Sequence, residues 1–307
     1  MLSIGKYLSK GGVRASLVEA LSGHLKVPSE SKLFLTSSGR ESLVTACLAL
    51  GSKSIVVSAI ARPEIKALNA LEGVRTLALD VNSQGVMDIP HLEQVRPDDY
   101  DTVIASCPMG VVPNLTELGD FCYSRDKTLI IEGFSSFCTP GIASVGDAFC
   151  TAFEEGSPLP VGSLGAVIFD CPAAVRKETK NLTNTGYFSV NRYSCAAALA
   201  ELEGLTEEVR SRREITSFYE DLLPRFFPTN WDSLAAYSFF PVFLPSSSFA
   251  YQVTQALLKR GIKVERLPVL MDQPGAKNLA ERTICLPAHS GVSDQQLDTI
   301  GSIFSKI

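Results

Sequence analysis

The chain has 307 residues, of which 45% are apolar and 20% are charged, and its formal net charge is -5. This composition is typical of a folded globular protein and excludes a largely disordered chain. No block of Lys and Arg is longer than a pair such as Arg212-Arg213, which argues against a nucleic-acid surface. No apolar run reaches the ~18 residues that a membrane-spanning helix needs, so we expect no membrane segment.

The length favours one large domain with a smaller one beside it. Residues 1–6 lack the apolar core of a secretory signal. The eight cysteines show no C-x-x-C spacing, and most of them stand in apolar company, as Cys47 does. Reduced, buried cysteines are typical of the cytoplasm, so we expect a cytoplasmic protein.

Short apolar runs alternate with helical patterns through the first half of the chain. Continuous apolar strands that alternate with helices indicate a parallel sheet covered on both faces. Gly51 marks the end of one predicted helix, and Pro63 marks the start of another. We predict strands over 32–36, 54–58, 74–80, 102–106, 128–132 and 166–169, and helices over 17–25, 41–50, 63–71 and 115–124.

The pattern changes after Val190, where an Ala/Leu/Glu-rich helix leads into a charged one. Ser293 is a good N-cap for a closing helix. We predict helices over 195–205, 207–223, 251–260 and 293–306, and strands over 238–244, 263–265 and 283–287. Together these elements describe a small α/β domain. We therefore divide the chain into a large domain, residues 1–205, and a small domain, residues 206–307.

The common catalytic motifs, G-x-S-x-G, H-E-x-x-H, the Walker loop and G-x-G-x-x-G, are all missing. The three histidines lie far apart in sequence, so we expect no metal site. The best local signal is the segment T-S-S-G-R over 36–40, at a strand-to-helix junction. Helix-end amides there suit a phosphate, with Ser38 and Arg40 available to help. The alternative is an ordinary Ser N-cap beside an exposed arginine.

Taken in order, these pieces resemble the DegT/DnrJ/StrS family of sugar aminotransferases. The resemblance covers nearly the whole chain. It is carried by S-G-R-E-S-L over 38–43, like the family's phosphate-cup motif S-G-[TR]-x-A-L, and by I-I-E-G-F-S over 130–135, like v-I-E-D-x-A. Residues 162–166 are similar to the glycine-rich piece after the cofactor lysine, and L-P-A-H over 286–289 is similar to the closing L-P-x-H.

The resemblance implies the fold type I architecture of pyridoxal phosphate (PLP) transferases. That architecture has a large domain with a mostly parallel seven-stranded sheet and a small C-terminal α/β domain. It also implies a homodimer, in which the segment at Asn191 reaches the neighbouring subunit's phosphate cup.

Three positions depart from the family pattern. Counting along 153–165 (FEEGSPLPVGSLG), the Schiff-base lysine should fall at Ser157, and serine cannot form an imine with PLP. The aspartate that pairs with the pyridinium nitrogen should fall at Gly133. The aromatic residue that stacks on the PLP ring in the family should fall near Arg62. The preceding Glu132 cannot substitute for the aspartate, because alternation along a strand points it to the opposite face.

Lys180, in T-K-N-L over 179–182, mimics the family's lysine motif. It lies beyond the glycine-rich piece, where the family has a charged surface helix. The alternative that Lys180 is the catalytic lysine stays open.

These departures favour a homologue that has lost Schiff-base catalysis, with no catalytic residue and no cofactor expected. It would keep a pocket for a nucleotide sugar or another phosphate-bearing small molecule, or act as a non-catalytic partner of an active aminotransferase paralogue. One alternative is a working PLP-dependent aminotransferase or dehydratase of nucleotide-sugar or surface-polysaccharide biosynthesis. A purely structural scaffold is a third possibility. The pocket residues expected from the resemblance are Ser38, Gly39, Arg40, Arg62, Ser135, Ser157 and Asn191.

Overall fold

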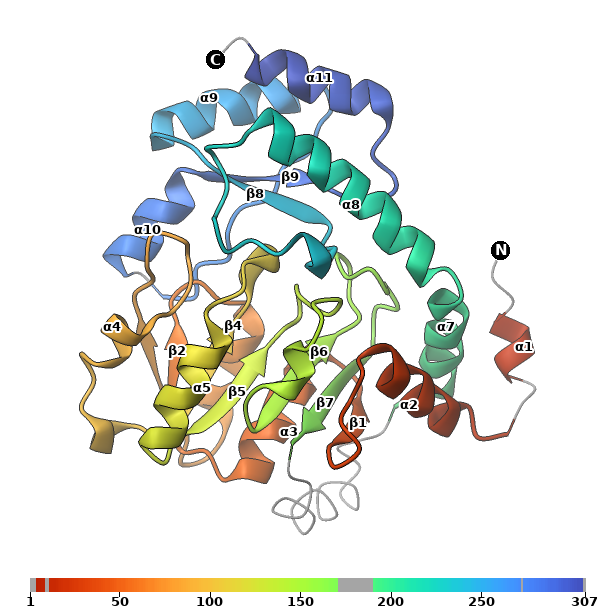
Figure 1. Ribbon diagram of the computed structural model, residues 1–307, viewed down its shortest axis with the longest axis vertical. Helices are drawn as coiled ribbons and strands as arrows, with labels where there is room; N and C mark the ends of the chain where they lie inside the picture. Colours follow the sequence, from red (N-terminus) through yellow and green to blue (C-terminus); the bar gives the residue numbers. More distant parts are fainter. Residues whose placement is uncertain (1–3, 9–10, 171–189, 272, 306–307) are drawn as a thin grey trace.

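The computed structural model describes residues 4–8, 11–170, 190–271 and 273–305, and its larger part is built on one seven-stranded sheet (Figure 1). The strand order is β1-β7-β6-β5-β4-β2-β3. β7 runs antiparallel to both of its neighbours, and the other pairs are parallel. This confirms the predicted mostly parallel sheet. The strands are β1 (Lys32–Thr36), β2 (Ser54–Ser58), β3 (Arg75–Leu79), β4 (Thr102–Ser106), β5 (Thr128–Glu132), β6 (Ala148–Ala152) and β7 (Gly165–Phe169).

Helices cover both faces of this sheet, and side chains alternate between the two faces along each strand. On β5, Leu129 and Ile131 join a core with α2 (Val13–His24), α5 (Leu115–Ser124) and α7 (Arg192–Leu202). Ile130, between them, joins the core on the other face with α3 (Gly39–Leu50) and the 3₁₀ helix η1 (Pro63–Ala70). β4, β6 and β7 are buried along their whole length, as continuous strands in a covered sheet should be, whereas the edge strand β3 is mostly exposed or half-buried.

A smaller unit sits above the sheet in Figure 1 and contains the antiparallel pair β8 (Phe239–Phe243) and β9 (Thr283–Pro287). Its core includes Tyr219, Phe240 and Ile300, and α8 runs along it from the end of α7. The division of the chain at residue 205 stays an expectation. The helices of this unit are α8 (Leu205–Leu222), α9 (Ser247–Leu258), α10 (Pro274–Glu281) and α11 (Asp294–Phe304).

α11 begins with the predicted cap, since the Ser293 and Gln296 side chains each bond the other's backbone N–H.

Short helical segments lie in the connections between the longer elements. The short segments are α1 (Ile4–Leu8), α4 (Ile89–Leu92), η2 (Pro97–Asp99), η3 (Pro108–Gly110), η4 (Ile142–Ser144) and η5 (Ser233–Ala235).

The predicted strand over 263–265 is wrong. Only Glu265 pairs there, in a single bridge with Cys285. The chain then leaves β9 to bond the large unit, where the carbonyl of Pro268 accepts the N–H of Ala61 at 3.1 Å. The sequence prediction missed the helix α10, short segments such as α1 and α4, and the strand β6, whose short run A-F-C-T-A carries little periodic signal.

Asp80, at the end of β3, ties the two units together. Its two carboxylate oxygens accept the N–H groups of Gly275 and Ala276, each at 2.7 Å, at the start of α10. Burial alone would raise the pKa of Asp80, but the backbone N–H groups of Gly275, Val81 and Ala276 lower it. This carboxylate therefore caps a helix of the small unit from the edge of the large sheet.

Candidate functional site

The predicted strand-to-helix junction is the N-terminus of α3. Ser38 is the N-cap, and its Oγ accepts the N–H of Glu41 at 3.2 Å. Gly39 is closely enclosed, because a Cβ there would lie 2.8 Å from both the Ala152 Cβ and the Phe134 ring. A glycine is therefore required by packing at this helix end.

Carboxylates of the chain itself approach the amides of this helix end. Glu154 Oε1 accepts the N–H of Gly39 at 3.4 Å, and its Oε2 accepts from Arg62 Nη2 at 3.0 Å. The Glu41 carboxylate accepts the N–H of Ser37. The positive end of α3, which favours anions, thus has internal carboxylates as its partners.

Arg62 links this helix end to the small unit. Its guanidinium lies 5.8 Å from the centre of the Phe134 ring, and its Nη1 donates to the Tyr237 hydroxyl at 3.4 Å. Burial raises the pKa of Tyr237, against the opposing effects of Arg62 and of a hydrogen bond with Ser135. The structure therefore brings the half-buried Arg62 and the buried Ser135 together around Tyr237.

Glu132 stands at the end of β5 and is only 1% exposed. Its Oε1 accepts the N–H of Phe134 at 3.1 Å. Burial raises the pKa of Glu132 to about 7, although the charge of Arg62 and the Phe134 N–H oppose this rise. A carboxyl with this pKa is substantially protonated near neutral pH, which lowers the negative charge that faces Arg62.

Gly133 follows Glu132 and has no room for a side chain. A Cβ at this position would overlap the ring of Phe149, which is 1% exposed. The backbone is fixed as well, because the Gly133 N–H bonds the Cys150 carbonyl at 2.9 Å. An aspartate could enter here only if Phe149 moved.

Ser157 is 2% exposed and is engaged within its own loop. Its Oγ accepts the N–H of Leu159 at 3.1 Å, and its N–H bonds the Glu154 carbonyl at 3.0 Å. The hydroxyl therefore stabilises a turn.

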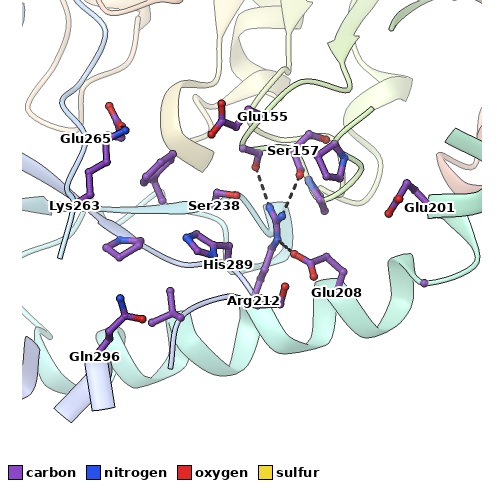
Figure 2. A pocket seen from close by; sticks show the side chains of 18 of the residues that line it. Glu155, Ser157, Glu201, Glu208, Arg212, Ser238, Lys263, Glu265, His289 and Gln296 are labelled. Atoms are coloured by element: carbon purple, nitrogen blue, oxygen red, sulfur yellow. Dashed lines mark hydrogen bonds and ion pairs between the residues drawn. The ribbon is translucent and has the colours of Figure 1, made fainter. Parts of the chain in front are cut away.

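Arg212 of α8 holds this loop in place (Figure 2). Its guanidinium donates to the carbonyls of Gly156 at 2.9 Å and Ser157 at 3.1 Å, and also to Ala236 at 3.1 Å. Nε pairs with Glu208 at 2.6 Å, and the side chain of Arg212 is only 4% exposed. Sequence reasoning missed this residue, because its acceptors are backbone carbonyls that lie far away in the sequence and leave no side-chain signal.

A cavity of about 740 Å³ opens beside this loop, and we call it the loop cavity (Figure 2). Ser157, Arg212 and His289 line it, but Ser38, Gly39 and Arg62 do not. Burial, and secondarily the charge of Arg212, lower the pKa of His289. Acids outnumber bases on the cavity's walls, which include Glu155, Glu201, Glu207, Glu208 and Glu265.

Two predicted site residues lie apart from this cluster. Arg40 is exposed and makes no hydrogen bond or ion pair with the residues that the structure describes. Asn191 is exposed and caps α7, where its Oδ1 accepts the N–H of Tyr193 at 2.8 Å. Lys180 lies outside the described residues.

Within the described ranges, no group of three or more His, Cys, Asp or Glu side chains is placed to hold a metal ion. Among the same residues, no helix has the length and apolar character needed to cross a membrane.

The topology explains why the clustered segments meet. β1, β5 and β6 run in the same direction, so their carboxyl ends lie at one edge of the sheet. The segments that follow these strands begin with Ser37, Gly133 and Phe153. In open α/β sheets this edge is where ligands bind.

No protein-family model matches the chain. Solved structures match it over almost its whole length. The aminotransferase TlmJ from Streptoalloteichus hindustanus is 20% identical with a TM-score of 0.84, over 98% of this chain and 93% of that one. A DegT DnrJ EryC1 StrS aminotransferase from Brucella abortus is 16% identical with a TM-score of 0.83, over 99% and 93%. NtdA from Bacillus subtilis, with bound PMP, is 14% identical with a TM-score of 0.84, over 99% and 80%.

The chain has the fold of the DegT/DnrJ/EryC1/StrS aminotransferases. This confirms the fold that the motif order implies, type I of the PLP-dependent transferases. At identities of 20% and below, the similarity establishes the architecture of this aminotransferase fold, and the chemistry has to be argued from the site itself.

Proposed function

We propose that this protein is a sugar-aminotransferase homologue that does not carry out Schiff-base PLP chemistry and instead binds a sugar-bearing ligand. The observation that carries the proposal is the position of Glu154. Its carboxylate lies between the Gly39 N–H and the Arg62 guanidinium, at the helix end that the family's motif would use for a phosphate.

The residues around this point do not fit PLP. A phosphate at the end of α3 would face the negative charge of Glu154, and like charges in a partly buried site repel strongly. Ser157 offers no amine for an imine. Phe149 fills the space that a carboxylate at position 133 would need, so a pyridine nitrogen has no anionic partner there. Three features thus act against the same cofactor.

The loop cavity is the better candidate for a ligand. Its volume of about 740 Å³ lies within the range of small-molecule sites. Glutamate, serine, histidine and glutamine side chains on its walls are hydrogen-bonding partners for sugar hydroxyls, and Phe239 gives an apolar surface. The excess of glutamates favours a neutral or amino-bearing sugar. A phosphate-bearing ligand, such as a nucleotide sugar, would gain the amides of α3 only by displacing Glu154.

A non-catalytic subunit could act as a homodimer or as the partner of an active aminotransferase. Asn191 supports contact with a neighbour, because it is exposed at the start of α7 and bonds only within its own helix end among the described residues. Co-purification with a lysine-bearing paralogue would support the partner role. A clean homodimer in light scattering would favour the first arrangement.

A second candidate function, a working PLP-dependent aminotransferase or dehydratase, is favoured by the matched structures, one of which holds PMP. It requires another lysine, such as Lys180. The visible spectrum separates the two candidates, because PLP joined to a lysine is yellow. We expect the purified protein to be colourless and to stay so after one equivalent of PLP. A stable yellow complex would contradict the proposal.

Ligand binding is tested separately by saturation-transfer NMR with glucosamine, glucose and UDP-glucose. We expect signals from glucosamine or glucose, and loss of those signals in Val292→Trp, which narrows the loop cavity. Val269→Trp, at an exposed residue that does not line the cavity, is the control. Equal signals in both variants would place the ligand elsewhere.

A further inference from the structure

A second cavity, of about 660 Å³, lies on the other side of α8 and shares no lining residue with the loop cavity. We call it the α2–α8 cavity. It is formed by the end of α2 with residues 25–26, by the segment 137–141, and by one side of α8 between Leu205 and Ser217. Arg212 lines the loop cavity and the next residue, Arg213, lines this one, as expected for neighbours that point about 100° apart on a helix.

Part of this cavity is a rigid apolar wall. Leu25, Phe137 and Val209 are buried residues that line it. The Phe137 ring is fixed between two others. His24 stacks on it with ring centres 5.4 Å apart, and Phe153 meets it edge-on at 5.1 Å. A preformed wall of this kind suits the flat or apolar body of a small molecule.

Arg213 supplies the polar feature of this cavity. Its Nη2 donates to the Leu234 carbonyl at 3.3 Å, but its Nε is buried and has no hydrogen-bond partner among the described residues. A buried N–H without an acceptor loses its hydrogen bond to water and gains none in return, so such groups are normally satisfied.

The neighbouring arginines of α8, unlike Arg213, have carboxylate partners. Arg210 pairs with Glu207 and Glu214, and Arg212 pairs with Glu208. Arg213 has no carboxylate partner within the described ranges. Lys26 and Arg210 are further cations on the lining, and Glu214, already paired with Arg210, is the only acid among the described residues that line it. The cavity therefore combines an apolar wall with a guanidinium that lacks an anion.

We propose that the α2–α8 cavity binds an organic anion that carries one acidic group on a flat apolar body. The acidic group pairs with the guanidinium of Arg213, whose side chain lines the cavity, and the body lies against Phe137, Leu25 and Val209. A carboxylate, sulfonate or phosphate would each meet this requirement, because each is a planar or tetrahedral oxyanion that a guanidinium recognises. The site is independent of the function proposed above.

The test uses 8-anilinonaphthalene-1-sulfonate, a fluorescent aromatic anion, with the full-length protein in its native state. We expect saturable binding of one equivalent. Ser217 lies one helical turn after Arg213, is exposed and lines the cavity. Ser217→Glu places a carboxylate within reach of Arg213, and we expect it to weaken binding at least about tenfold. Ser217→Gln, with the same shape and no charge, should bind like the wild type.

Arg213→Met is a second variant, and it should lose binding to the same degree as Ser217→Glu. A thermal melt of each variant checks that the probe reports a folded site. Equal affinity in Ser217→Glu and Ser217→Gln would overturn the proposal, and so would failure of the wild type to bind one equivalent. Benzoate should displace the probe, whereas inorganic phosphate at the same concentration should not. Displacement by phosphate alone would overturn the requirement for an apolar body.

Discussion

Glu154 and Gly39 meet at the N-terminus of α3, where the carboxylate of the first accepts the amide of the second at 3.4 Å. Because Arg62 bonds the same carboxylate at 3.0 Å, the chain itself supplies the anion that both groups favour. An external phosphate must therefore compete with a tethered internal group. This relationship explains how the geometry of a phosphate-binding helix end can persist without a phosphate ligand.

Glu154→Gln should expose this anion site. The change removes the negative charge and keeps the shape, so inorganic phosphate should bind at least about tenfold more tightly, which corresponds to ~1.4 kcal/mol. Isothermal titration with phosphate measures the change. Glu155→Gln, at the adjacent exposed residue, is the matched control and should leave phosphate affinity unchanged. Equal phosphate affinities in the two variants would show that the Glu154 carboxylate does not compete with phosphate for the N-terminus of α3.

Gly133 and Phe149 should be strongly coupled. Gly133→Asp alone should destabilise the protein by at least about 2 kcal/mol, because its Cβ would overlap the Phe149 ring. Phe149→Ala alone should cost about 3–5 kcal/mol through the cavity it leaves.

In the double variant the aspartate occupies the vacated space, so the two costs should not add, and the coupling should reach about 2 kcal/mol. Urea unfolding of the four proteins measures this cycle. Simple additivity would contradict the packing described here. For the same reason, Ser157→Lys with Gly133→Asp should not restore PLP binding unless Phe149 is also reduced in size.

Replacing Arg212 should lower the free energy of unfolding more than replacing an exposed arginine of the same helix. Arg212→Met leaves the carbonyls of Ser157 and Ala236 without their donor and that of Gly156 with the Ser238 N–H alone, and we expect a loss of about 3 kcal/mol. Arg210→Met on the same helix removes exposed ion pairs and should change stability by less than about 1 kcal/mol. Denaturant unfolding of both variants gives the comparison. Similar losses would mean that the loop does not depend on Arg212.

Glu132 should make stability depend on pH in a defined direction. Burial raises its pKa from 4.5 to about 7 in the folded protein, so folding favours the protonated form. The favourable contribution is fully present below pH 4.5 and is lost as the pH rises through about 7. Relative to Glu132→Gln, the wild type should therefore lose stability between pH 4.5 and pH 7. Parallel stability profiles for the two proteins across this range would contradict a raised pKa.

Much of the sheet could be predicted from local pattern, because continuous apolar strands such as 102–106 and 128–132 carry their own signal. β6 was missed, since A-F-C-T-A is short and its burial comes from tertiary packing. The segment 263–265 was predicted as a strand. Only Glu265 pairs with β9, because the chain turns away at once to bond Ala61 of the larger unit through Pro268. Such non-local competition has no signature in a short window.

The site was predictable only where the motif order fixed a position, as at Ser38, Gly133 and Ser157. What fills the site is decided by Glu154, Phe149 and Arg212. Their partners Gly39, Gly133 and Gly156 lie between 16 and 115 residues away from them along the chain. Glu154 stands in the loop 153–165, where the Schiff-base lysine was expected, yet nothing in F-E-E-G-S distinguishes it from Glu155. Only the fold shows that one carboxylate turns to α3 while the other is exposed.

We propose that no lysine of this chain carries PLP. The most direct measurement is peptide mass mapping of protein purified from PLP-replete cells and reduced with borohydride, with no PLP added afterwards. Borohydride fixes any lysine–PLP imine, so the map covers every lysine, including Lys180. We predict that every lysine peptide has its unmodified mass. A stoichiometric pyridoxyl adduct on Lys180 or on any other single lysine would contradict the account.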